Sequence, residues 1–290
     1  MCLVALAVGQ STRFPLVIAT NRDEFLARAS AALDWWTPQA GAEPVLGGRD
    51  LVGGGTWMGL TAPGRWALLT NVRAPGCNDP QAPTRGGLVT EWLAGSEGAD
   101  PFCRRIAARG CNGFNLVAGD VLRSKCFWAS SATPSAQPIA PGVHGLSNAS
   151  FDTPWPKVVA LKARLASAVA AAVSAEGLAG ALFEVLADRT PADASMLPKT
   201  GVAPDVELQL SSAFVDMPER AYGTRCSTVL IVEQRESRRS VCMLERTFDA
   251  GSTPVRRERH VTLPDWPQAP SARAADPLPL QRTSGHQASR

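Results

Sequence analysis

The distribution of apolar runs along the chain constrains the fold most, because strand-like and helix-like stretches occupy separate regions. Short apolar runs such as LVALAV, LVIAT, RWALLTNV and FNLVAGD, with Gly, Pro or Asp between them, are typical of β-strands. Residues 156–189 are instead Ala-rich, with apolar side chains at helical spacing. STVLIVEQ and SVCMLERTFD, joined by the charged RESRR, predict a late hairpin. We therefore expect an α+β fold in which sheets pack on each other and are covered by helices.

The chain is long enough, at 290 residues, to bury a sizeable core, and we expect a single domain over residues 1–266. Residues 267–290 are rich in Pro, Ala, Ser and Arg and contain few large apolar side chains. Such a segment buries too little surface to offset its chain entropy, so we predict a disordered tail. The polar, Pro-rich residues 191–219 predict a long loop.

Charge and cysteine content exclude several classes of partner. A net charge of +3 with no long Lys/Arg block argues against nucleic acid, and we interpret Arg256, Arg257 and Arg259 as a solvated strand end or loop. The seven cysteines are irregularly spaced and only three histidines occur, so we expect reduced thiols and no metal site.

Nothing in the sequence predicts membrane insertion or export. No stretch approaches the ~18 apolar residues of a membrane span. The apolar start lacks a positive segment before it and a small-residue cleavage site after it. We therefore expect a cytoplasmic location.

Cys2 directly follows the start methionine. An initiator methionine is normally removed when the second residue is small, which would leave Cys2 with a free α-amine. That amine has an ordinary pKa of about 7.7–8.0 and can act as base for the thiol of its own residue. From position alone, Cys2 also fits an apolar strand residue.

The tetrapeptide NRDE, Asn21 to Glu24, follows the apolar run PLVIA and therefore lies at a strand end or in the turn after it. Beside an N-terminal cysteine, Asp23 could hold the α-amine, and Arg22 could lower the pKa of the thiol. A polar turn that ends a strand is the alternative interpretation.

Other polar residues end or begin apolar runs. Asn71 ends one run, where its amide could stabilise an oxyanion, and Asn148 lies in a predicted turn before the helical region. Thr224 and Arg225 begin a strong strand. The glycines of GGGTWMG (53–59) predict a tight turn or a close approach, without the order of a dinucleotide-binding motif. Taken singly, each of these stretches also fits ordinary turn chemistry.

The stretches Cys2, NRDE, GGTWMG, LTN, NGFNL, GLSNA…TPWPK and YGTRCST occur in the order found in the NRDE family, named after the tetrapeptide. The chain resembles this family, which includes the transport and Golgi organisation proteins, from residue 1 to about 248, apart from residues 191–219. The resemblance implies an N-terminal-nucleophile hydrolase fold, a four-layer αββα sandwich.

The resemblance also assigns site residues, by motif order and residue type. Within this fold, the similar chemistry is that of penicillin V acylases and bile salt hydrolases, which cleave amides with an N-terminal cysteine. The implied catalytic residues are Cys2 as nucleophile, Arg22 and Asp23 beside it, Asn71 and Asn148 near the oxyanion, and Arg225 on a late strand. The implied ligand-binding residues are Asn21, Glu24, Trp57, Arg73 and Thr224.

Two functions follow as expectations. The first is hydrolysis of an amide or thioester of an acyl or amphipathic small molecule, for which no cofactor is required. The second, implied by the family, is a non-catalytic intracellular carrier for haem or acyl-CoA-type ligands, with arginines facing anionic groups and tryptophans lining the pocket. A scaffolding role has no specific sequence feature, and the sequence does not indicate an oligomeric state.

Overall fold

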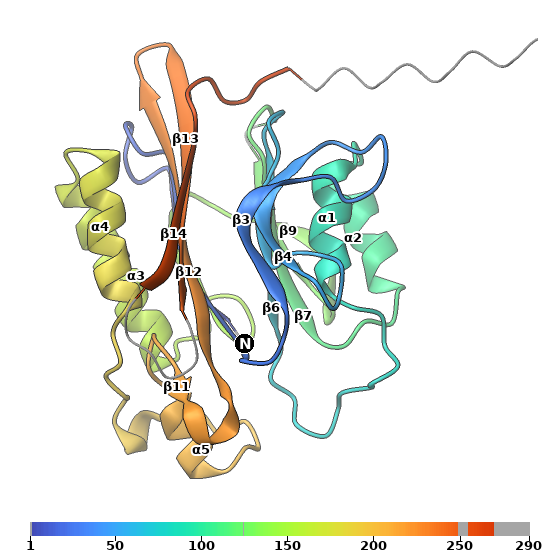
Figure 1. Ribbon diagram of the computed structural model, residues 1–290, viewed down its shortest axis with the longest axis vertical. Helices are drawn as coiled ribbons and strands as arrows, with labels where there is room; N and C mark the ends of the chain where they lie inside the picture. The colour runs from blue at the N-terminus through green and yellow to red at the C-terminus, as the bar shows by residue number, and fades with distance from the viewer. Residues whose placement is uncertain (1, 124, 249–254, 270–290) are drawn as a thin grey trace, which may run out of the picture.

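The computed structural model describes residues 2–123, 125–248 and 255–269 (Figure 1). Two antiparallel β-sheets stack face to face, and helices cover both outer faces. The predicted α+β class and its four-layer αββα arrangement are therefore confirmed. Residues 270–290, which make up most of the predicted disordered tail, lie outside the described residues.

The first sheet contains the first and the last strand and has the order β10-β1-β2-β12-β13-β14, with β11 paired to β12. Its strands are β1 (Cys2–Val8), β2 (Leu16–Phe25), β10 (Gly142–Leu146), β11 (Asp216–Met217), β12 (Tyr222–Arg235), β13 (Arg238–Phe248) and β14 (Val255–Leu263). The predicted late hairpin is the β12–β13 pair, and NRDE forms the last part of β2, as the strand-end interpretation predicts.

The second sheet follows the chain without a crossover, in the order β3-β4-β5-β6-β7-β8-β9. Its strands are β3 (Ser30–Trp36), β4 (Val45–Asp50), β5 (Met58–Leu60), β6 (Arg65–Asn71), β7 (Phe114–Asp120), β8 (Lys125–Ser130) and β9 (Thr133–Pro138). The edge strand β3 lies beside β13 and β14 of the first sheet, so the two sheets approach each other along this side.

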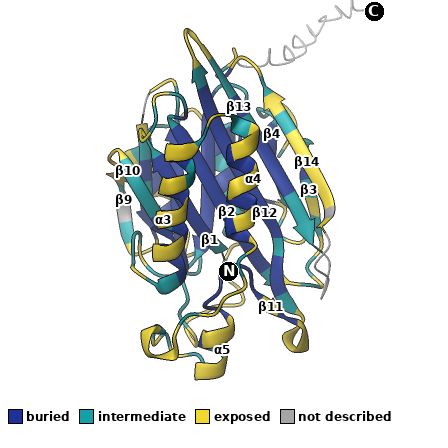
Figure 2. Cartoon of the chain, turned by 90° about the vertical axis from the view of Figure 1, so that its left-hand side faces the viewer, coloured by how far each residue is buried: buried dark blue, intermediate teal, exposed yellow. Residues whose placement is uncertain are grey.

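Two helix pairs form the outer layers. The helices α3 (Pro156–Ala171) and α4 (Ala175–Leu186) cover the first sheet, whereas α1 (Gly86–Ala94) and α2 (Ala99–Ala107) cover the second. The α3 helix starts with a proline at its first position, and the Ser174 hydroxyl accepts a hydrogen bond from Gly177 N at the start of α4. Figure 2 shows α3 and α4 lying with exposed outer faces across the buried strands of the first sheet.

Strand alternation divides the core into layers. On β1, Leu3 and Ala5 pack against α3 and α4, while Val4 and Leu6 belong to the cluster between the two sheets. A third cluster, which includes Trp92, joins α1 and α2 to the second sheet. Every residue of a buried strand is thus committed to one of two faces.

Two segments differ from the sequence-based expectation. Residues 191–219 are not simply a loop, because they contain a 3-10 turn (Ala194–Met196), α5 (Pro204–Gln209), β11 and the start of a second 3-10 turn (Pro218–Arg220). The cluster of arginines after residue 255 belongs to the edge strand β14 rather than to a loop or a strand end.

The described chain continues beyond β14 without leaving the protein surface. Trp266 is buried, and its Nε1 donates to the carbonyl of Thr61 at 2.9 Å. No helix within the described ranges has both the length and the hydropathy needed to cross a membrane.

Candidate functional site

Cys2 lies at the first position of β1, in a row of paired residues that crosses the first sheet. Its register partner on β2 is Arg22, and the partner of Arg22 on β12 is Cys226. Directly paired residues share one face of a sheet, and Val4, two positions along β1, packs between the sheets. Cys2, Arg22 and Cys226 therefore face the second sheet.

Arg22 is buried against an aromatic ring of the opposite sheet. Its guanidinium carbon lies 4.3 Å from the centroid of the Trp57 ring, and one nitrogen lies 3.8 Å from Glu24 Oε2. Trp57 can take this position because Gly48 has no side chain: a Cβ there would lie 2.2 Å from a ring carbon of Trp57. Arg22 Nη1 is buried, and no atom of the described residues accepts a hydrogen bond from it.

Asp23 faces the other side of β2, toward α3. It is 1% exposed, and its Oδ1 accepts a hydrogen bond of 2.7 Å from Thr224 Oγ1, which itself accepts from Val215 N. Because the β1–β2 register places Cys2 opposite Arg22, the backbone nitrogen of Cys2 lies on the side of Asp23. The structure thus brings the predicted nucleophile and the predicted amine-binding carboxylate together at one end of the sheet.

Burial shifts the pKa of both members of this pair. It raises the pKa of the Cys2 thiol and also the pKa of the Asp23 carboxyl, in the second case against the opposing effect of the Lys157 ammonium. The Cys2 carbonyl accepts a hydrogen bond from Ser147 Oγ at 3.0 Å, which fixes the backbone of the first strand residue. A thiol in such surroundings needs a base close by before it can attack a carbonyl carbon.

Asn71 and Asn148 meet where the two sheets come together. Asn148 Nδ2 donates to the backbone carbonyl of Asn71 at 2.8 Å, and the carbonyl of Asn148 accepts from Arg73 N at 2.7 Å. Ser147 Oγ, which holds Cys2, lies 3.2 Å from Asn148 Oδ1. The side-chain amide of Asn148 has a second hydrogen for an oxyanion, because its NH₂ group carries two.

Arg73 connects the end of β6 to the segment of residues 191–219. Its Nη1 lies 2.5 Å from Glu207 Oε2 of α5, and its guanidinium carbon lies 4.9 Å from the centroid of the Trp155 ring. Glu207 also accepts hydrogen bonds from the backbone and the hydroxyl of Thr200. Residues 191–219 are therefore part of the wall around the site, which a loop interpretation did not predict.

Lys157 is a site residue that sequence reasoning missed. It is 6% exposed, and its Nζ donates to the carbonyl of Leu210 at 2.8 Å. Burial lowers its pKa to about 8, while the charge of Asp23 opposes that shift. The only signal for it was its place in TPWPK, because a lysine in the first turn of a helix is otherwise read as solvated.

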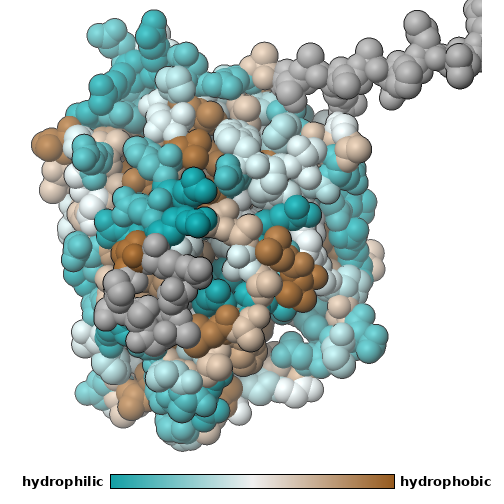
Figure 3. Space-filling model, in the orientation of Figure 1, coloured by the Kyte–Doolittle hydropathy of each residue, from teal (hydrophilic) through white to brown (hydrophobic). Residues whose placement is uncertain are grey.

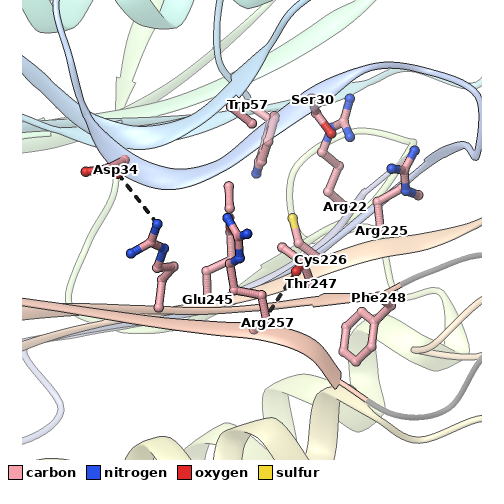
Figure 4. A pocket seen from close by; sticks show the side chains of 13 residues that line it. Arg22, Ser30, Asp34, Trp57, Arg225, Cys226, Glu245, Thr247, Phe248 and Arg257 are labelled. Carbon is pink, nitrogen blue, oxygen red and sulfur yellow. Dashed lines mark hydrogen bonds and ion pairs between the residues drawn. The ribbon is translucent and has the colours of Figure 1, made fainter.

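A cleft of about 310 Å³ opens between the sheets where β3 lies beside β13 and β14; we call it the arginine cleft. Its lining includes Arg22, Arg225, Arg257, Arg259, Trp57 and Glu245. In Figure 4, side chains from both sheets point into this space, and Figure 3 shows hydrophilic and hydrophobic residues mixed on this face. The lining does not include Cys2, so Arg22 is the residue that joins the cleft to the nucleophile.

Arg225 is the extra residue of a β-bulge, because Thr224 pairs with Asp23 and Cys226 with Arg22. Its Nη1 donates to the carbonyls of Phe25, Leu26 and Arg28, at 2.8–3.2 Å. The structure therefore places Arg225 on the cleft wall, where it also holds the turn after β2.

The remaining predicted ligand-binding residues take different places. Asn21 is fully buried toward the helices, where its Nδ2 donates to the carbonyls of Leu186 and Ala213. Glu24 Oε1 accepts from Phe25 N, and Glu24 lies beside Arg22 and Arg28. Within the described ranges, no group of three or more His, Cys, Asp or Glu could hold a metal ion.

Comparisons with known proteins show which proteins this chain is similar to. The sequence model of the family described as Transport and Golgi organisation 2 matches residues 1–250. The human Transport and Golgi organization protein 2 homolog is 33% identical over 236 residues, which cover 76% of this chain and 83% of the human one. The Drosophila melanogaster Transport and Golgi organization protein 2 is 28% identical over 260 residues, covering 80% and 88%. Among solved structures, a conjugated bile acid hydrolase from Clostridium perfringens matches with a TM-score of 0.47 and 8% identity, covering 90% and 92%.

Proposed function

The chain belongs to the Transport and Golgi organisation 2 family, and from this premise we propose that it is an N-terminal-cysteine hydrolase for an amide or thioester of an acyl or amphipathic small molecule. One observation carries the proposal: Cys2 starts β1 with buried Asp23 on the side of its backbone nitrogen. A free amine at that nitrogen would have a carboxylate partner already in place.

The reaction uses the groups of Cys2 itself for proton transfer. After Met1 is removed, the neutral α-amine takes the proton of the thiol while Sγ attacks the carbonyl carbon. The amides of Asn71 and Asn148 stabilise the resulting oxyanion. When the intermediate collapses, the leaving amine or thiolate takes the proton from the α-ammonium, and the acyl group stays on Sγ. A water molecule then gives a proton to the amine and attacks the thioester, the C–Sγ bond breaks to release the acid, and Sγ takes the proton back from the α-ammonium.

The raised pKa of the Cys2 thiol explains why a base within the same residue matters. Burial keeps the thiol protonated at neutral pH, so a solvent-generated thiolate is scarce. An amine on the same residue removes the proton at the moment of attack. Its ordinary pKa of about 7.7–8.0 keeps it partly neutral under those conditions.

Mass spectrometry tests this proposal without knowledge of the natural substrate. We expect the intact protein to begin at Cys2, and a panel of acyl thioesters and acyl amides to leave an acyl group on the Cys2 peptide. The variant Cys77→Ala, which removes an exposed thiol, should retain that adduct. A protein that retains Met1, or one acylated only at other cysteines, would contradict the proposal.

The arginine cleft supports a second candidate function. We propose, as the alternative, a carrier for haem or acyl-CoA-type ligands, whose carboxylates or phosphates would bind the cleft arginines. Arg22 Nη1 is buried, and no described residue accepts a hydrogen bond from it, which supports an anionic ligand at this place. His144 is a poor candidate for an iron ligand, because both of its ring nitrogens already have hydrogen-bond partners: Asp152 Oδ2 at 2.7 Å and the carbonyl of Ala140 at 2.9 Å.

Ligand titration separates the carrier from the hydrolase. If the protein is a carrier, the variant Arg22→Gln should bind haem or acyl-CoA at least about tenfold more weakly than the wild type, because a charge-assisted contact is lost. Cys2→Ala should bind as tightly as the wild type. Arg13→Gln serves as the control, since Arg13 pairs with Glu233 away from the cleft. Equal affinities for Arg22→Gln and Arg13→Gln would rule out the cleft as the binding site.

A further inference from the structure

Lys157 is a buried cation in a place that disfavours one. It is the second residue of α3, and the first turn of a helix carries the positive end of the helix dipole. Burial adds a desolvation penalty, so a lysine here needs compensation from other groups. One backbone contact is visible, from Nζ to the carbonyl of Leu210 at 2.8 Å.

The main charge that compensates Lys157 is Asp23. Among the charged neighbours of Lys157, Asp23 has the largest effect on the lysine pKa, and Lys157 in turn has the largest effect among the charges that act on Asp23. The charge of Cys2 also acts on Lys157. The three groups therefore form one electrostatic unit that joins β1, β2 and α3.

We propose that Lys157 is a positioning residue for the terminal amine of Cys2: its ammonium compensates the Asp23 carboxylate and so keeps that amine neutral enough to take the thiol proton. The inference rests on the proposed function in one respect, namely that the chain begins at Cys2. With a pKa of about 8, Lys157 is mostly protonated at pH 7, and the proton that is transferred moves only between Sγ and the α-amine.

The direction of the effect follows from the charges. Without Lys157, the Asp23 carboxylate would find its counter-charge chiefly in the amine, and a nearby opposite charge favours the ammonium form. The pKa of the amine would rise, so that at neutral pH the amine would already carry a proton. The negative charge would also disfavour the thiolate. Both effects move the reactivity of Cys2 to higher pH.

Other charged groups around this unit come from every element packed against it. They are Arg22 and Glu24 on β2, Arg73 after β6, Arg85 before α1, Glu207 on α5 and Tyr222 on β12. Arg73 and Glu207 are already paired with each other. They stay unchanged in the experiment below, so its readout reports on Lys157 and Asp23 alone.

The test measures the rate at which iodoacetamide alkylates Cys2 as a function of pH, followed by the mass of the N-terminal peptide. Each full-length variant is prepared to begin at Cys2 by cleavage of an N-terminal fusion, and folding is checked by thermal denaturation. Lys157→Met should move the midpoint up and slow alkylation at pH 7, where Lys157 with its pKa of about 8 is mostly protonated, by about tenfold or more, the usual effect of a close charge. Lys157→Arg keeps the charge and should keep the wild-type midpoint.

Two further variants sharpen the result. Lys162→Met makes the same substitution on the same helix, at a lysine that pairs with Asp152 instead, and should leave the midpoint unchanged. The double variant Asp23→Asn with Lys157→Met removes both charges and should return the midpoint toward the wild type. Should Lys157→Met not fold, Lys157→Gln carries the same expectation.

Three outcomes would overturn the inference: no shift in Lys157→Met, an equal shift in Lys157→Arg, or a shift that persists in the double variant. The first shows that the charge has no effect, the second that only side-chain shape matters, and the third that Asp23 is not the intermediary. Because alkylation needs no turnover, its outcome is separate from that of the hydrolase proposal. A clear shift in a protein that cleaves no acyl compound would overturn the hydrolase and leave the role of Lys157 in place.

Discussion

Replacing Cys2 with alanine is expected to reduce turnover of an acyl amide or thioester on the order of 10⁴-fold or more, because the variant lacks the atom that would form the proposed covalent intermediate. Residual activity would come from binding and from the oxyanion donors alone. The measurement is kcat/KM for the best substrate of the panel, together with the acyl adduct on the N-terminal peptide.

A second cysteine provides the matched control for this prediction. Cys242 lies on β13 of the same sheet but packs toward α3 and α4, so Cys242→Ala removes a strand thiol of similar burial on the opposite face. We expect it to retain turnover within a few-fold of the wild type. If Cys2→Ala kept more than about a tenth of the activity, a loss far smaller than removal of a nucleophile causes, another group would have to be the nucleophile.

Replacing Arg73 with methionine is expected to lower the free energy of unfolding by about 3–5 kcal/mol, the usual loss when one member of a buried ion pair is removed. The side chains of Arg73 and Glu207 are only 6% and 5% exposed, and their closest atoms lie 2.5 Å apart. In the variant, the carboxylate of Glu207 on α5 would stay buried without a cation to pair with. Chemical denaturation, with the slope compared between variants, measures the change.

An exposed pair of similar length gives the control for Arg73. Arg189 and Asp216 lie 2.7 Å apart, but their side chains are 37% and 38% exposed. Arg189→Met should therefore lower the free energy of unfolding by less than about 1 kcal/mol. The double variant Arg73→Met with Glu207→Met should recover much of the loss, since no unpaired charge stays buried. Equal losses for Arg73→Met and Arg189→Met would mean that burial does not set the strength of the Arg73–Glu207 pair.

The predicted elements that the structure confirms are those with strong periodicity. The helical region became α3 and α4, and the late apolar runs became β12 and β13, because each has an apolar face that needs a partner. The strands β4 and β14 gave weaker patterns. In β4, two glycines replace strand-forming side chains, one of them to accommodate Trp57, and β14 is a largely exposed edge strand rich in charges.

In the site, too, some residues could be predicted from the sequence and others could not. The proximity of Cys2, Arg22 and Asp23 could be predicted because the candidate nucleophile and its neighbours lie on two sequential strands joined by a short connection. Lys157 could not, because it comes from a helix more than a hundred residues away along the chain. The role of Arg73 in ligand binding stays a prediction, and the structure adds a partner that no motif indicated, Glu207, which pairs with its guanidinium.

By itself, the sequence determined the fold class, the family motifs and the candidate nucleophile, since these depend on local periodicity and on residue types at fixed places in the chain. Only the tertiary structure decided what surrounds Cys2. Arg22 and Asp23 are neighbours in sequence, yet strand alternation sends one into the arginine cleft and the other toward α3. Whether the buried charges are compensated depends on Lys157 and Glu207, which long-range packing brings to the site, and no local pattern in the sequence records such packing.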